Sequence, residues 1–482
     1  MDQTPSRQGM SRRDLTIVLV ISLGSFMAGL DATIVNIALP SIARYFNVST
    51  VTVSWVLNAY LIVMVSLLLA ASRLGDMKGY RNIFLIGFFL FTLGSMFCGI
   101  APNIGALILA RMLQGMGGAV ISALGAVMIT TYLSPAVRGQ ALGIMSMFLM
   151  LGVAFGPVVG GFLTSTFSWR FIFYVNLPVG IAATLLGMKV LPELRPSIPQ
   201  TTMDLPGVLL LFIALGCLVT GLTSAQGHRI FLGFVLIAIS LVFWFFFFLR
   251  ERRTSSPLIN LSLFYNRDFT LQNIGILLVQ MAMAGVMIMM PFYLELIRNI
   301  PTDHAGVILL TMPVGMILSA PIAGRLSDVI GTKKPIIAGF LICAAATLLL
   351  SNLSAQTGTG FVALYLLLFG CGTGVTFTPL ASAVMGEAPV SERASSSGLM
   401  RGMTNIGSTL GVAVVMLVGM IAAGPKLAEV TASRIPSTEL TGAFDTAFFF
   451  CMLLEIAGIL LMLPVRDREP SGDEKADTLL GI

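Results

Sequence analysis

Two charged residues lie deep inside long apolar segments of the chain. Asp31 falls within the apolar block 15–39, and Arg111 falls within the block 105–131. Ionised side chains are costly in hydrocarbon, so they usually face a cavity and serve a function there. Desolvation favours a neutral acid and a nearby cation favours a carboxylate, so motion between the two environments would change proton affinity. Asp31 is predicted to carry a proton, and simple helix pairing is the alternative.

The helical rise places these two charges at a similar depth. Pro40 is expected to end the first block, about 13 Å beyond Asp31, and the other block begins near Asn103, about 12 Å from Arg111. Gln114 lies one helical turn after Arg111 and could bridge the two charges. We expect Asp31, Arg111 and Gln114 to form the proton-coupling group. A purely structural Arg111 is the alternative.

Further polar residues inside apolar blocks are candidates for contact with a substrate, although interhelical hydrogen bonds are an equal alternative. Two of them are acids, which could instead bind a second proton. The candidates are Asn58, Asn273, Gln280, Glu295, Asn405 and Glu455.

The sequence shows no residue pattern for a disulfide, a metal site, a catalytic triad or a nucleotide site. The five cysteines lie in apolar blocks without a CxxC pattern, which disfavours disulfides and metal sites. The two histidines, His228 and His304, fall in loops, and no Ser/His/Asp constellation accompanies them. No GxxxxGK[ST] loop is present for nucleotide binding. We therefore expect no enzyme activity and no cofactor, with a proton gradient as the energy source.

The elements that hold these residues are membrane spans. Of 482 residues, 56% are apolar and 10% are charged, whereas a soluble domain carries about 25% charge. Blocks of about 20 apolar residues can cross the hydrocarbon as helices. The predicted fold is an all-α polytopic membrane protein with fourteen spans, near 15–39, 51–72, 82–101, 105–131, 139–166, 170–191, 205–223, 230–250, 269–297, 304–327, 335–353, 359–384, 395–423 and 441–464.

The basic residues predict the orientation. Most of the 28 Lys and Arg residues fall in the segments on one side, and six fall in the loops on the other. Positive loops stay on the cytoplasmic side. This predicts a multi-pass protein of the plasma (inner) membrane with both termini in the cytoplasm.

The chain also repeats itself. The pattern R-L-x-D-x-x-G occurs at 73–79 and again at 325–331, and a second match pairs Arg138 with Arg393 at almost the same offset. Two matches at one offset indicate duplicated halves. We therefore divide the chain into a cytoplasmic N-terminus (1–14), a six-helix half (15–191), an insertion of two helices with flanking loops (192–267), a second six-helix half (268–464) and a cytoplasmic tail (465–482).

Four motifs resemble those of the major facilitator superfamily, specifically its fourteen-helix drug/proton antiporter branch. The segment 30–40, LDATIVNIALP, is similar to the first-helix motif of that branch. The loop 72–79 resembles the general G-x-L-x-D-x-x-G loop, with Ser72 in place of the usual glycine and with Met77 and Tyr80 at commonly basic positions. RMLQG at 111–115 and GVAFGPVVGG at 152–161 resemble the fourth-helix and fifth-helix motifs.

This resemblance implies a fold and a function. It implies a major-facilitator fold that exports amphipathic or lipophilic small molecules, including cations, drugs or toxic compounds, in exchange for protons by rocker-switch alternating access. Asp31 and Arg111 would take part in the coupling. The expected partners are the substrate, protons and the lipid bilayer, without nucleic acid or nucleotide, and the protein is expected to be a monomer. A uniporter or symporter of one metabolite is the first alternative, and a non-transporting membrane sensor is the second.

The fifth-helix motif has its own mechanical interpretation. Gly152, Gly156 and Gly160 recur every four residues and leave one helix face bare, with Gly161 beside it, and Pro157 removes a backbone hydrogen bond. We expect this face to pack against the symmetry-related helix and seal one side of the transporter. Ordinary close packing is the alternative.

Charged residues of the repeated loop motifs predict a cytoplasmic gate. We expect them to pair across the halves and hold the inner side shut in one state, although charges in solvated loops are the alternative. The predicted gate residues are Arg73, Asp76, Gly79, Arg81, Arg138, Arg325 and Asp328.

Overall fold

The computed structural model describes residues 10–193, 204–224, 230–254, 261–389, 392–423 and 437–467. Within these ranges the elements are helices, and fourteen of them are long and apolar enough to cross a membrane. The predicted all-α fold with fourteen spans is confirmed. An even number of crossings places the start of the first span and the end of the last on one side, which we call the terminal side. The other side is the opposite side.

The first half contains six spans. They are α1 (Arg12–Phe46), α2 (Thr50–Lys78), α3 (Tyr80–Gly99), α4 (Ile104–Tyr132), α5 (Pro135–Thr166), and a sixth span built from α6 (Phe171–Tyr174) and α7 (Asn176–Val190). The expectation that Pro40 ends the first span is wrong, because α1 continues to Phe46 and is capped by Asn47 in the left-handed conformation. Neighbouring helices in a bundle allow such an internal proline.

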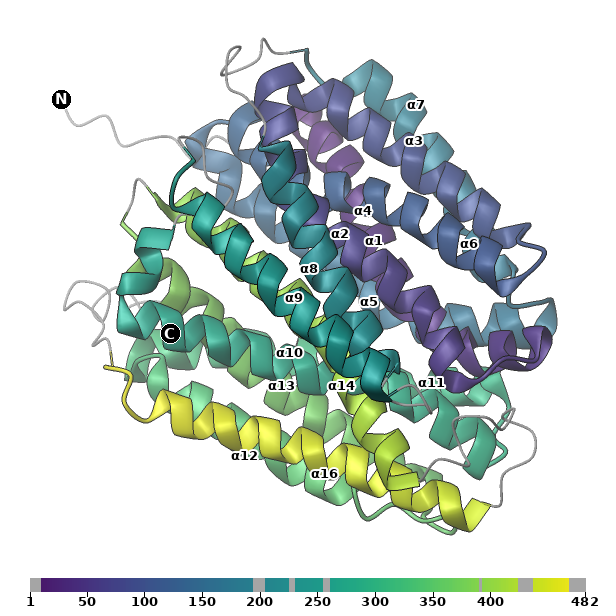
Figure 1. Ribbon diagram of the computed structural model, residues 1–482. Coiled ribbons are helices and arrows are strands. Elements are labelled where there is room, and N and C mark those ends of the chain that lie inside the picture. The colour runs from purple at the N-terminus through teal and green to yellow at the C-terminus, as the bar shows by residue number, and fades with distance from the viewer. Residues whose placement is uncertain are drawn as a thin grey trace, which may run out of the picture.

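The inserted pair and the second half follow. The inserted helices are α8 (Leu205–Ser224) and α9 (Ile230–Glu251), followed by the short η1 (Leu261–Tyr265). The second half comprises α10 (Arg267–Phe292), the π-helical turn η2 (Tyr293–Ile297), α11 (Thr302–Ile330), α12 (Lys333–Leu350), α13 (Thr359–Glu387), α14 (Arg393–Ala423) and α16 (Ser437–Met462). Figure 1 shows the two halves as separate groups, with α8 and α9 lying between them. The pair α8–α9 contacts α2 of the first half and α14 of the second.

Bare glycine faces join equivalent helices in each half. A Cβ atom added to Gly152 would collide with the Phe26 carbonyl oxygen of α1, and one added to Gly156 would collide with Thr33. In the second half, Gly407 and Gly411 of α14 meet the backbone of α10 in the same way. The expectation that the glycines of α5 face the symmetry-related helix is therefore wrong. Gly152, Gly156 and Gly160 fix α5 against α1 of the same half, because backbones approach closely only where side chains are missing.

The halves meet mainly on the opposite side. There Arg44 of α1 pairs with the buried Glu295 of η2. Gly306 of α11 packs against the Pro157 carbonyl of α5, and Gly161 packs against the Thr302 carbonyl. One apolar core spans both halves at this end, whereas toward the terminal side each half has a core of its own. The structure is sealed on the opposite side.

The predicted gate residues lie on the terminal side and stay within their own halves. Asp76 accepts a hydrogen bond from Tyr80 at 2.5 Å, Arg81 pairs with Glu193 at 3.2 Å, and Arg138 donates to the Leu133 carbonyl. Gly79 adopts a positive φ of 90° at the turn between α2 and α3. Among the described residues, neither Arg73 and Asp76 nor their counterparts Arg325 and Asp328 form an ion pair across the halves. The predicted latch is not formed in this conformation.

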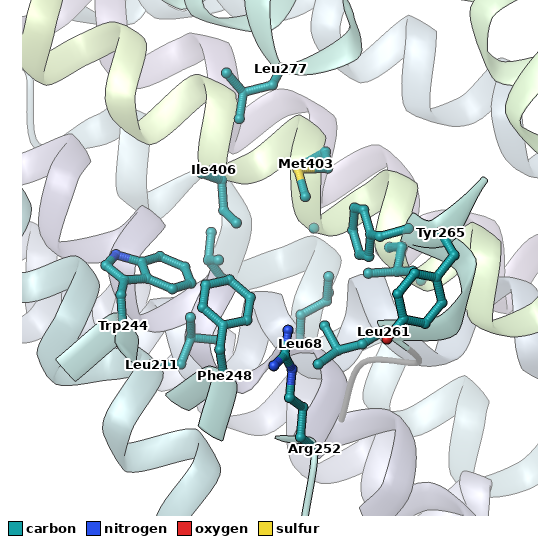
Figure 2. Close-up of a pocket in the computed structure, with 15 residues that line it drawn as sticks. Leu68, Leu211, Trp244, Phe248, Arg252, Leu261, Tyr265, Leu277, Met403 and Ile406 are labelled. Atoms are coloured by element: carbon teal, nitrogen blue, oxygen red, sulfur yellow. The ribbon is translucent and has the colours of Figure 1, made fainter. Parts of the chain in front are cut away.

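An apolar crevice lies beside the inserted pair (Figure 2). It has a volume of about 580 Å³ and is bounded by α2, α8, α9, η1, α10 and α14. Its wall includes Trp244, Phe248 and Met403, together with one cation, Arg252. The insertion therefore creates a cavity at the seam between the halves.

Gly152→Ala tests the role of the bare face of α5. The added methyl group has no room against the α1 backbone, so we expect a loss of about 1–3 kcal/mol of stability. Gly143→Ala in the same helix is the matched control, since nothing lies within 4 Å of its added Cβ. The control should be neutral or slightly stabilising. Thermal unfolding in detergent measures both, and equal midpoints for the two variants would contradict the packing argument.

Candidate functional site

Asp31 and Arg111 form a buried ion pair at the centre of the first half. The Arg111 Nη1 atom lies 2.8 Å from Asp31 Oδ2 and 3.0 Å from Oδ1. Their side chains are 0% and 1% exposed, so water does not screen the attraction. The sequence indicated a similar depth for the two residues and left their direct contact open. The structure brings them together.

Gln114 bonds to both charges, as the spacing suggested. Its Nε2 donates to Asp31 Oδ1 at 2.9 Å, and its Oε1 accepts from Arg111 Nη1 at 2.7 Å. The helical repeat of α4 sets Gln114 beside Arg111 on one face, and Gly94 lets α3 approach the Gln114 backbone closely. The amide therefore fixes the relative positions of the acid and the cation.

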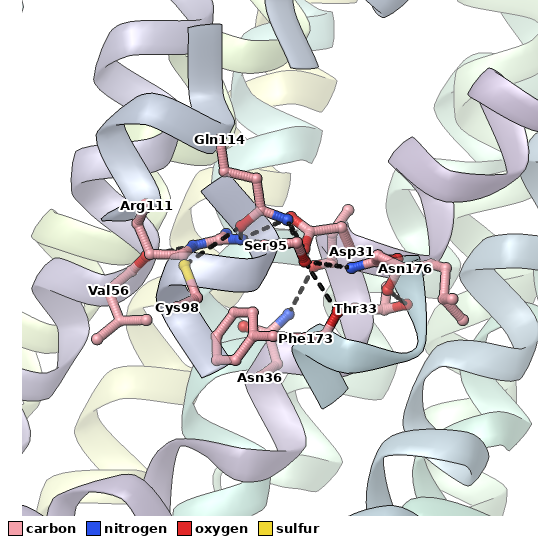
Figure 3. Close-up of polar contacts among 12 residues, drawn as sticks. Asp31, Thr33, Asn36, Val56, Ser95, Cys98, Arg111, Gln114, Phe173 and Asn176 are labelled. Atoms are coloured by element: carbon pink, nitrogen blue, oxygen red, sulfur yellow. Dashed lines mark hydrogen bonds and ion pairs between the residues drawn. The ribbon is translucent and has the colours of Figure 1, made fainter. Parts of the chain in front are cut away.

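Several residues that the sequence analysis missed complete the network (Figure 3). Ser95 accepts hydrogen bonds from Gln114 and from Asn176, and donates to the Phe173 carbonyl. Arg111 Nε donates to the Val56 carbonyl at 3.0 Å. Ser95 and Asn176 were visible as polar residues within apolar blocks, which is the signal that could have identified them.

An aromatic ring covers the cation. The Arg111 guanidinium carbon lies 4.2 Å from the centre of the Tyr60 ring. Gly115 and Gly118 of α4 leave room for Tyr60, because an added Cβ would meet the Tyr60 backbone or its hydroxyl. Desolvated cation–π contacts stabilise an arginine by about 2 kcal/mol or more. Close packing of α2 against α4 therefore places the Tyr60 ring against the Arg111 guanidinium.

A central cavity of about 170 Å³ lies between the halves, next to the ion pair. Arg111 and Tyr60 line it from the first half, and Gln280 and Asn405 line it from the second. Asp31 does not line this cavity. The volume is smaller than the roughly 300–1,000 Å³ of sites for drug-sized ligands, so such a ligand requires wider separation of the halves.

The remaining substrate candidates lie away from this cavity. Asn58 and Asn273 are fully buried, and Asn273 donates to the Phe269 carbonyl of its own helix. Glu295 belongs to the ion pair with Arg44 on the opposite side. Glu455 is fully buried in α16, and neither of its carboxyl oxygens has a hydrogen-bond partner among the described residues. Of the six candidates, the cavity brings together Gln280 and Asn405.

The chemistry that this site offers comes from ionisable and hydrogen-bonding groups. Asp31, Arg111 and Gln114 together hold one acid, one cation and one amide in a water-poor environment. No group of His, Cys, Asp and Glu within the described ranges could hold a metal ion. Protonation of Asp31 would turn a neutral pair into a site of net charge +1 beside the central cavity.

Comparison with known sequences adds independent information. The family model described as Major Facilitator Superfamily matches residues 21–412 and 273–479. A riboflavin transporter, RibZ, of Clostridioides difficile is 32% identical, over 82% of this chain and 86% of that protein. The tetracenomycin C resistance and export protein of Streptomyces glaucescens is 31% identical, over 92% and 84%. The multidrug resistance protein Stp of Mycobacterium tuberculosis is 33% identical, over 84% and 76%.

Solved structures share the fold. The nucleoside transporter NupG, as its D323A mutant, aligns with a TM-score of 0.66 at 12% identity, covering 93% of this chain and 99% of that one. The POT family transporter PepTSo aligns with a TM-score of 0.65 at 13% identity, covering 98% of this chain and 99% of that one. With the family model matching nearly the whole chain and relatives above 30% identity, this chain belongs to the major facilitator superfamily and is a multi-pass membrane transporter rather than an enzyme.

Proposed function

We propose that the protein exports amphipathic or lipophilic small molecules, cations among them, in exchange for protons. The observation that carries this proposal is the buried Asp31–Arg111–Gln114 network bordering the central cavity. Two relatives support export, since one is named for tetracenomycin C resistance and export and the other, Stp, for multidrug resistance. The cytoplasmic placement of both termini in the plasma (inner) membrane belongs to the same proposal.

Repulsion between the Arg111 charge and a cationic substrate would couple proton binding at Asp31 to substrate binding in the cavity. A proton on Asp31 leaves the Arg111 charge unbalanced, and Arg111 lines the cavity. Two cations repel each other strongly in a medium of low dielectric constant. A bound proton therefore weakens substrate binding, and by reciprocity a bound substrate weakens proton binding. This competition is the thermodynamic requirement for antiport.

A second function is favoured by one observation. The RibZ relative is named as a riboflavin transporter, which supports a uniporter or symporter of one specific metabolite. Such a protein would show a narrow substrate range and no exchange of the substrate for protons. The same transport experiment separates the two functions.

Asp31→Asn is expected to abolish proton-coupled transport, because an amide cannot release a proton to exchange for the substrate. The measurement uses purified protein in liposomes with an inside-acidic pH gradient, following a lipophilic cation and the internal pH together. In the wild type we expect substrate entry linked to proton efflux. In the variant, gradient-driven entry should fall to the level of protein-free liposomes.

Asp14→Asn is the matched control, since Asp14 is a half-buried acid in the capping box of α1 on the terminal side. It should transport like the wild type. Normal gradient-driven transport by Asp31→Asn would remove Asp31 from the proton site. Substrate movement without linked proton flux in the wild type, or movement of riboflavin alone, would favour the second function.

Alternating access requires the opposite side to open, and Gly306→Ala tests this motion. The added methyl group would collide with the Pro157 carbonyl, so the sealed conformation should become less populated. Spin labels on Phe167→Cys and His304→Cys, both exposed near that seam, report the separation of α5 and α11. We expect a longer mean distance in Gly306→Ala.

The control for this variant is Gly324→Ala in the same helix. There the nearest atom to an added Cβ is the Thr378 methyl at 3.7 Å, an ordinary contact. This variant should keep the wild-type distance distribution. An unchanged distribution in Gly306→Ala as well would show that the Pro157–Gly306 contact does not hold the seal.

A further inference from the structure

The crevice beside the inserted helices is larger than the central cavity and separate from it. Its volume is about 580 Å³, within the range of sites that hold whole small ligands. The crevice and the central cavity share helices α2, α10 and α14 but no lining residue. Adjacent residues of one helix line different spaces: Val65 and Ile406 line the crevice, whereas Met64 and Asn405 line the cavity. Side chains of α2, α10 and α14 therefore lie between the crevice and the central cavity.

One exposed cation, Arg252, lines this apolar space. Figure 2 shows the Arg252 side chain rising from one end of the crevice, with its guanidinium between Phe248 and Leu261. The neighbouring Arg250 is already balanced by Asp204 at 2.6 Å. Among the described residues, no carboxylate forms an ion pair with Arg252. The crevice therefore favours a ligand that carries a negative charge at this end.

The rest of the crevice suits a hydrocarbon chain. Arg252 follows directly after the last residue of α9, Glu251, where that span ends. Trp244 lies eight residues earlier, about 12 Å deeper along the helix. Phe248, Leu68 and Met403 line the path between them. The arrangement matches a molecule with an anionic head at the membrane surface and an apolar tail in the hydrocarbon.

We propose that this crevice binds an anionic phospholipid from the leaflet on the terminal side. Its phosphate pairs with the Arg252 guanidinium, whose geometry fits phosphate oxygens, and one acyl chain lies along Trp244 and Phe248. Basic pockets between transmembrane helices are known to hold such head groups. A transported cation is a poor occupant, because Arg252 repels it.

The lipid would add a contact among three parts of the transporter that already share an apolar cluster. The crevice wall includes α2 from the first half, α14 from the second half and α9 from the insertion. A chain seated there contacts all three, so the bound lipid fixes the inserted pair over the seam. This role does not depend on the identity of the transported substrate.

Quenching of Trp244 by brominated lipid tests the proposal. The full chain in nonionic detergent is titrated with phosphatidylglycerol or phosphatidylcholine brominated at mid-chain, and the Trp244→Phe variant supplies the signal of the other two tryptophans. We expect saturable quenching of the Trp244 component, at phosphatidylglycerol concentrations about tenfold or more below those of phosphatidylcholine. Unbrominated phosphatidylglycerol should reverse it, and a transported cation should not.

Two variants and a matched control make the test specific. Arg252→Gln should remove the preference for the anionic lipid, whereas Arg253→Gln, which loses the same charge outside the crevice, should keep it. Gly402→Leu should weaken the binding of both lipids, because the added side chain fills the crevice; nothing lies within 4 Å of a Cβ added at Gly402. Thermal unfolding checks that each variant is folded. Equal affinity for the two lipids, equal effects of the two arginine variants, undiminished binding to Gly402→Leu or displacement by a transported cation would overturn the proposal.

Discussion

The structure depends on holding an ion pair inside a water-poor protein. Removing Asp31 and Arg111 from water costs several kcal/mol for each ion, and their attraction offsets this only if the remaining polar atoms are also bonded. Gln114, the Val56 carbonyl and the Tyr60 ring meet that requirement. These groups come from α2 and α4, while the acid comes from α1. The pair therefore requires three helices of the first half to keep fixed relative positions.

That requirement explains where the chain is rigid and where it can move. Glycines bring α5 against α1 and α14 against α10 within the halves, so each half behaves as one packed body. Between the halves, contact is concentrated at the opposite side, where Arg44, Glu295 and the Pro157–Gly306 crossing lie. With the proposed orientation, this is a state sealed on the side away from the cytoplasm. A motion that breaks the seal leaves the ion-pair scaffold intact.

Sequence reasoning was sufficient for features governed by length and local geometry. Blocks of about 20 apolar residues can only be helices in lipid. The depth of Asp31 was counted from Pro40, which does not end α1, so that count did not establish that Asp31 and Arg111 would meet. Sequence reasoning was not sufficient for features set by helix rotation. Ser95 and Asn176 are single polar residues in segments that are apolar all round, so no periodicity shows which way they face. The spacing of Gly152 and Gly156 showed a bare face, but its partner helix depends on the assembled bundle.

The position of Asp31 behind Arg111 separates two tasks that a transporter must perform. In the proposed mechanism, a molecule in the central cavity would contact Arg111, Gln280 and Asn405, and a proton on Asp31 would act on it through the arginine. Substitutions at Gln280 or Asn405 would therefore change which compounds fit without altering the energy source. Single substitutions in the cavity could then change the transported substrate while the proton-coupling residues stay the same.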